Sequence, residues 1–231
     1  MSKGLIIGGV LFLMLIVIGV VVYFMMMKDE EPILVPTAGP APGPAPGPAP
    51  GPAPPKTIKT NQILSTVSDP VTLTGVQANN PSTFNAKTKG VLIANIAIDA
   101  DSEGVIFESG ATGRGIVLYA FDGSIYFQAG AGNVAGGTIE VSSPINSTLS
   151  KNQKTEIGVS VDVSANPSRA RLFINGVEVD NSTSGATPSL SGSDAAGSGK
   201  KYGGISVSRL SPYSVYSDTI YDVTLYPGVY I

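Results

Sequence analysis

Three acidic residues at alternating positions are the feature of this sequence with the clearest catalytic potential. Asp99, Asp101 and Glu103 stand two residues apart, and on a continuing β-strand this spacing would place their carboxyl groups on one face. Two carboxyl groups on one face can act as acid and nucleophile in glycoside hydrolysis. The segment runs directly into Gly104, as a turn would. We therefore expect a solvated turn here and no catalytic residue.

The absence of several residue types further narrows the range of reactions and metal sites that the chain could support. The 231 residues include no His, no Cys and no Trp. Without His the chain lacks the commonest metal ligand and neutral-pH proton shuttle, and without Cys it has neither disulfides nor thiolate sites. The net charge is -3 and no basic stripe is present, so nucleic acid is not an expected partner. The composition favours a binding or structural protein over an enzyme.

The N-terminal segment has the length and composition of a membrane span. Residues 4–27 carry no charge and exceed the about 20 apolar residues that a helix needs to cross a bilayer. A cleavable signal peptide has a shorter apolar stretch and a small-residue cleavage site, whereas here Met25, Met26, Met27 and Lys28 stand in that place. Residues 1–28 are therefore predicted to be an uncleaved signal anchor. Lys3 precedes the span and acidic residues follow it, which favours an exported C-terminal domain.

A Pro-rich linker is predicted at residues 29–56. Four tandem copies of Gly-Pro-Ala-Pro occupy residues 39–54. Alternate prolines fix φ and remove backbone donors, which favours an extended polyproline II rod. At about 3.1 Å per residue the rod would span roughly 60 Å. We interpret it as a spacer between the membrane and a folded domain.

Residues 57–231 read as an all-β domain. The apolar residues of the segment TEIGVSVDVS alternate with polar ones, which predicts a half-buried strand with Ile157, Val159 and Val161 on one face. The dipeptides Asp122–Gly123 and Asn175–Gly176 suit the positive φ of hairpin turns. We therefore predict an antiparallel sandwich of jelly-roll type. The apolar-poor segment 182–201 is expected to be a long mobile loop.

The succession of segments also resembles a known family. GVIFESGATGRGIVLYAFDGSIYFQAG, TEIGVSVDVSANPSRARLFINGVEV and DTIYDVTLY, within residues 91–226, are similar to the strand order of concanavalin A-like, laminin-G-like domains. The resemblance implies that fold, and a calcium site at the sheet rim with Asp99, Asp101 and Asn133 as ligands. Glycosidases of this fold begin their acid motif with Glu and keep apolar residues between the acids, which this sequence does not.

Other candidate site residues lie on the predicted surface. Tyr213, Tyr216 and Tyr230 are candidate contact residues, because tyrosine combines apolar area with a polar tip. Asn146 and Asn181 each begin an Asn-Ser-Thr sequence, the acceptor pattern for N-glycosylation.

Two functions account for anchor, rod and sandwich together. The first is a membrane-anchored, non-catalytic binding module that presents its domain to a glycan or protein ligand. The second is a virion structural protein, a minor capsid component or a tether between a membrane and neighbouring shell proteins. The anchor, the repeats and the Cys-free sandwich resemble membrane-associated proteins of large DNA viruses of algae. We expect no cofactor for either function, apart from the calcium ion that the resemblance implies.

Overall fold

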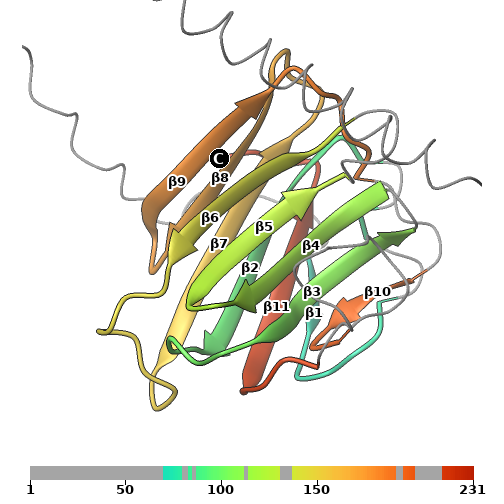
Figure 1. Ribbon diagram of the computed structural model, residues 1–231. Coiled ribbons are helices and arrows are strands. Elements are labelled where there is room, and N and C mark those ends of the chain that lie inside the picture. The colour runs from blue at the N-terminus through green and yellow to red at the C-terminus, as the bar shows by residue number, and fades with distance from the viewer. Residues whose placement is uncertain are drawn as a thin grey trace, which may run out of the picture. The chain divides into compact units, whose positions relative to one another are not determined.

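Two antiparallel β-sheets pack face to face in the computed structural model of the protein (Figure 1). The structure describes residues 70–79, 83–84, 87–111, 114–130, 137–190, 195–200 and 215–231. The six-stranded sheet has the order β1 (Val71–Leu73), β11 (Ile220–Pro227), β2 (Lys89–Ala97), β7 (Lys154–Asp162), β8 (Ser168–Ile174) and β9 (Val177–Ser184). The five-stranded sheet has the order β10 (Ala195–Ser198), β3 (Gly104–Ala111), β4 (Arg114–Phe121), β5 (Ser124–Ala129) and β6 (Ile139–Pro144). The predicted antiparallel sandwich is confirmed, and no helix occurs within these ranges.

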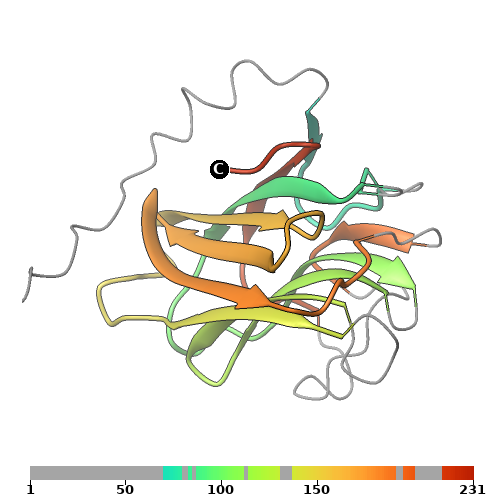
Figure 2. The same cartoon turned by 90° about the horizontal axis from the view of Figure 1, so that it is seen from above.

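The core lies between the two sheets (Figure 2). Alternate residues of each strand point into it, as period-two patterning requires. On β7 these are Ile157, Val159 and Val161, all of which belong to the buried cluster as predicted. The largest side chains that are fully buried there include Phe84, Phe107 and Phe127.

Both predicted hairpins form with the expected backbone. Asp122 and Gly123 have φ angles of 47° and 66° and connect β4 to β5. Asn175 and Gly176 have φ angles of 50° and 75° and connect β8 to β9. Two consecutive residues with positive φ match the right-handed twist of the flanking strands. The first turn sets the register of β4 against β5, and the second sets that of the first pairs of β8 and β9, before the register shifts between Phe173 and Leu172.

The outer face of β7 differs from the prediction. A half-buried strand should expose Ser160 and Asp162, yet they are 0% and 6% exposed. The last residues of the chain lie over this part of the sheet, where the backbone N–H of Ile231 donates to Ser160 Oγ at 2.9 Å. Ile231 also packs with Val91 and Ile93 in a second apolar cluster. The alternation of apolar and polar residues along β7 cannot predict that this face is covered, because the covering residues come from a segment remote in the chain.

The predicted loop at residues 182–201 is wrong in part. Strand β9 extends through Ser184, and residues 195–198 form β10, which pairs with β3. Leu190 is fully buried in the core. Small residues such as Ala196 and Gly197 allow β10 to form through backbone pairing, so its low apolar content conceals a strand. Residues 191–194 and 201 lie outside the described residues.

The sheet edges are protected to different degrees. Strand β9 curves along the side of the sandwich toward β6 (Figure 2), and Asp180 Oδ2 accepts a hydrogen bond from the Ser142 N–H at 2.8 Å. The free side of β10 is bonded by the Asn79 N–H, which donates to the Ala196 carbonyl at 2.7 Å. Strand β1 is only three residues long and pairs with β11 alone. Covered or short edges limit pairing with other chains.

The predicted anchor and linker, residues 1–56, lie outside the described residues. Within the part of the chain that the structure describes, no helix is long and apolar enough to cross a membrane.

Candidate functional site

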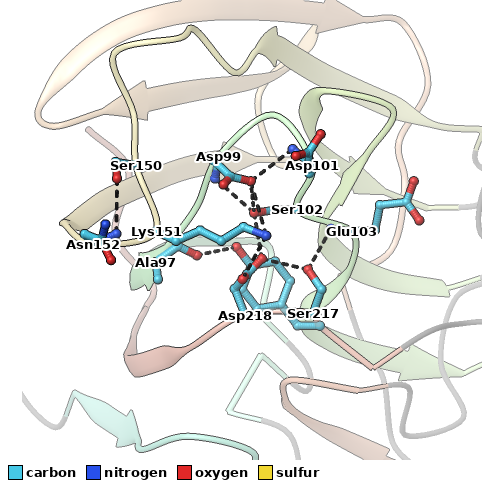
Figure 3. Close-up of polar contacts among 11 residues, drawn as sticks. Ala97, Asp99, Asp101, Ser102, Glu103, Ser150, Lys151, Asn152, Ser217 and Asp218 are labelled. Carbon is cyan, nitrogen blue, oxygen red and sulfur yellow. Dashed lines mark hydrogen bonds and ion pairs between the residues drawn. The ribbon is translucent and has the colours of Figure 1, made fainter.

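The three acidic residues singled out in the sequence lie in the turn between β2 and β3 (Figure 3). Asp99 Oδ1 accepts a hydrogen bond from the Asp101 N–H at 3.0 Å, and the Ser102 N–H donates to the Asp99 carbonyl at 3.1 Å. Asp101 and Glu103 are exposed, whereas Ser102 is fully buried. The expected turn is present, and the acids do not continue a strand.

Ser102 is the centre of a polar cluster that joins three segments. Its Oγ donates to Asp218 Oδ2 at 2.7 Å and accepts the Asp99 N–H at 2.9 Å. Lys151, from the turn before β7, places Nζ 3.2 Å from Asp218 Oδ1 and 3.4 Å from Asp99 Oδ1. The Lys151 side chain is 40% exposed and that of Asp218 only 11%. One cation therefore pairs with both carboxylates from the solvent side.

The segment before β11 completes this cluster. Ser217 Oγ donates to Asp218 Oδ2 at 2.7 Å and accepts the Glu103 N–H at 3.0 Å. Tyr216 is 5% exposed, and its hydroxyl donates to the Ala97 carbonyl at 2.7 Å. Because burial raises the pKa of Tyr216, its phenol remains neutral. These contacts fix the segment against β2 and β3, which is a structural role.

The cluster predicts an acid-dependent loss of stability. Burial acts to raise the pKa of Asp218, but hydrogen bonds from Ser217 and Ser102 and the contact with Lys151 hold it below the ordinary value of 3.8. A carboxyl group with a lowered folded-state pKa stabilises the fold above its unfolded pKa and ceases to do so as pH falls through the folded value. We expect the free energy of unfolding to fall below about pH 4.

Urea unfolding at neutral pH and at about pH 3 measures this dependence. Asp218→Asn should flatten the wild-type loss across that interval. Asp122→Asn, at an exposed hairpin turn, is the matched control and should keep the wild-type profile. An Asp218→Asn profile as steep as that of the wild type would contradict the assignment.

Two of the three predicted calcium ligands, Asp99 and Asp101, lie in the same turn. Asp99 contacts Lys151, and the exposed Asp101 contributes its backbone N–H to the turn. Asn133 lies outside the described residues. Within the described ranges no group of three acidic side chains is placed to hold a metal ion. The calcium site stays a prediction.

The remaining predicted site residues fall in different environments. Tyr216 is buried, so its ring belongs to the core rather than to a contact surface, and Tyr213 lies outside the described residues. Tyr230 is half-buried, with Arg169 and Arg171 guanidinium carbons 4.2 and 5.4 Å from its ring centroid. These cations compete with an external ligand for that ring.

The two glycosylation candidates are both exposed. Asn146 precedes β7 in a turn, where its Oδ1 accepts a hydrogen bond from the Thr148 N–H at 3.0 Å. Asn181 lies on β9, and its Nδ2 donates to Glu178 Oε1 at 3.0 Å. Their modification stays a prediction.

An aromatic cluster lies on the outer face of the five-stranded sheet, away from the core. Tyr119 of β4 and Tyr126 of β5 are cross-strand partners whose rings stack with centroids 5.1 Å apart and planes inclined by 14°. Tyr119 is fully buried, while Tyr126 and Phe121 are half-buried and pack against it. We call Phe121 and Tyr126, with the buried Tyr119 beside them, the aromatic face.

Polar residues adjoin the aromatic face on the next strand. Ser142 of β6 is the cross-strand partner of Tyr126, and Glu140 is that of Gln128. Directly opposed residues point to the same side of a sheet, so the Ser142 hydroxyl and the Glu140 carboxylate border the rings. Both are half-buried. Half-buried aromatic side chains beside a few polar groups are the composition of an organic-ligand site.

The sequence contained a signal for this face that hairpin analysis overlooks. In β4, Ile116, Leu118 and Ala120 point into the core. The intervening Val117 and Tyr119 form a separate apolar cluster on the other side. A strand that is apolar on both faces has a second apolar surface in addition to its core face. Such a surface is either covered by another segment or used for binding.

The fold defines an antiparallel β-sandwich, and comparison with known proteins assigns it no family. No family model and no curated protein matches the chain. Among solved structures, it is similar to the CBM40 domain of Ruminococcus gnavus IT-sialidase bound to α2,3 sialyllactose, at 13% identity and a TM-score of 0.49, over 69% of this chain and 89% of that one. It is also similar to the receptor-binding domain of botulinum neurotoxin type G, at 12% identity and a TM-score of 0.41, over 70% and 43%. Likeness of this degree assigns no function.

Proposed function

We propose that this protein is a non-catalytic binding module that recognises a glycan through the aromatic face of its β-sandwich. The observation that carries the proposal is the half-buried pair Phe121 and Tyr126, packed against the buried ring of Tyr119, on which Tyr126 stacks. A sugar ring presents apolar C–H groups on its face and hydroxyl groups at its edge. An aromatic platform bordered by the Ser142 hydroxyl offers a partner to each.

The electrostatics of the acid turn support a non-catalytic role. Glycoside hydrolysis needs one protonated and one ionised carboxyl group that face a common cleft. Here Asp99 and Asp218 share the cation of Lys151. The pKa of Asp218 is lowered, which is opposite to the shift that a general acid requires. Asp101 and Glu103 are exposed and form no ion pair with another described residue.

We further propose that residues 4–27 anchor the module in a bilayer and that residues 29–56 hold it away from the surface. Display on a stalk suits a weak binder, because many copies on one membrane raise the effective concentration for a multivalent ligand. A glycan that repeats its recognition unit would benefit most from this arrangement.

A glycan array with the full chain in detergent micelles tests the proposal. We expect selective binding that falls about ten- to a hundredfold in Tyr126→Ala, because the ligand then loses an aromatic contact worth about 1.5–3 kcal/mol. Tyr126→Phe should bind within about threefold of the wild type, since stacking needs the ring.

The matched control is Tyr221→Ala. Tyr221 lies on the six-stranded sheet and is 39% exposed, so its loss should leave binding unchanged. A blank array for the wild type, or equal loss in both alanine variants, would overturn glycan recognition by the aromatic face.

A further inference from the structure

A separate polar pocket lies at the end of the sandwich where β7 leads into β8. Its volume is about 490 Å³. The walls come from Thr88 before β2, from the loop of Ser164, Ala165 and Asn166, and from the residues that follow β9, including Thr187. None of these residues belongs to the aromatic face, so the two surfaces are distinct.

The pocket wall is held in place by Asp162. Its Oδ1 accepts hydrogen bonds from the Ser164 N–H, the Ser164 hydroxyl and the Ala165 N–H at 3.0, 2.6 and 3.2 Å. Its Oδ2 pairs with Arg169 at 3.2 Å. Because these bonds shape the loop without a ligand, little ordering cost remains at binding.

The chemistry of the lining selects a class of ligand. The side chains of Thr88, Asn166 and Thr187 are exposed and form no hydrogen bond to another described residue. Hydroxyl and amide groups both donate and accept, which matches the hydroxyl groups of a polyol. No lining residue is charged or aromatic. An ionic ligand would lose hydration without gaining a counter-charge.

We propose that this pocket binds one uncharged sugar ring, independently of the aromatic face. The volume falls within the roughly 300–1,000 Å³ typical of small-molecule sites. The sugar would form hydrogen bonds in the pocket but would not stack on an aromatic ring. Because small polar ligands of this kind have a low ligand efficiency, we expect a Kd of about 1 mM. The pocket would bind either a further unit of the glycan that the aromatic face recognises or a different sugar.

Amide-detected NMR of the full chain in micelles tests this proposal. Methyl α-glucopyranoside, methyl α-galactopyranoside and methyl α-mannopyranoside are the probes, each titrated against isotope-labelled protein. We expect at least one to shift the backbone amides of Ser164, Ala165 and Thr187 with saturation. Glucuronic acid should shift the same amides at least about tenfold more weakly, because its charge is not compensated.

Two variants localise the binding. Ala165→Leu adds bulk to a half-buried loop position and should abolish the shifts, whereas the matched Ala165→Ser should retain them. Thr187→Val keeps shape, removes a hydroxyl and should weaken binding about tenfold. Tyr126→Ala should leave the pocket titration unchanged, which separates it from failure at the aromatic face. No saturable shift with any methyl glycoside, or full binding in Ala165→Leu, would overturn the proposal.

Discussion

Gly115→Ala should destabilise the protein by about 3 to 5 kcal/mol, since it combines backbone strain with a steric clash. Gly115 is the second residue of β4 and pairs with Gly110 of β3, at a φ of 111°. A Cβ there would lie 2.0 Å from the Ser109 carbonyl oxygen and 2.5 Å from the Gly110 Cα. Both obstacles are backbone atoms, so the strands must separate to admit the methyl group.

Urea unfolding of the wild type and variant measures the effect as a shift of midpoint. Gly185→Ala is the matched control, because a Cβ at that position has no neighbour within 4 Å. That change should be neutral or stabilise by up to about 1 kcal/mol. Equal midpoints for Gly115→Ala and the wild type would show that β3 and β4 are not paired at this point.

Phe127→Ala should destabilise by about 3 to 5 kcal/mol, through lost transfer energy and the cavity left behind. Phe127 of β5 is fully buried between the sheets. Its cross-strand neighbours are Leu118 and Val141, and both are fixed in paired strands, so they cannot move inward to fill the space. Thermal unfolding should show a clear fall in Tm.

Val177→Ala provides the comparison for this core substitution. Val177 is 38% exposed on the edge strand β9, and a change there should stay within about 0.5 kcal/mol. Phe127→Leu, which keeps most of the volume, should fall between the two. A fall in Tm as small for Phe127→Ala as for Val177→Ala would place the ring outside the core.

The sequence predicted the parts of the fold that depend on neighbouring residues. Asp122–Gly123 and Asn175–Gly176 encode turns through their own backbone preferences, and the structure has both with positive φ. The alternation of Ile157, Val159 and Val161 identified a strand and its core face. Such signals are local, because steric and hydrogen-bonding preferences act within a few residues.

Features that depend on distant segments were not predictable. Ser160 is buried because Ile231 lies over it. Strand β10 exists because Ala196 and Gly197 pair with Ser109 and Glu108, although their own composition suggests a loop. Neither outcome is encoded in a window of a few residues, since each requires a partner from elsewhere in the chain.

The candidate sites show the same division. The turn at Asp99 followed from its sequence, but its ion pair with Lys151 links residues far apart in the chain. The aromatic face joins Tyr119 and Tyr126 through the register of one hairpin, so it was within reach of the sequence. The pocket beside Ser164 combines three segments and required the folded structure.

The position of β1 has a mechanical consequence if residues 1–56 tether the domain as proposed. The described chain begins at residue 70, next to a three-residue edge strand whose Val71 and Leu73 oppose Leu225 and Val223 of β11. A ligand held against flow would load the domain through that point. Tension that pulls Val71 away from β11 would break the backbone hydrogen bonds of β1 one after another, because the load would fall on the first of them. Strand β1 would therefore detach first and lengthen the connection by a few residues, while β11 remains paired with β2.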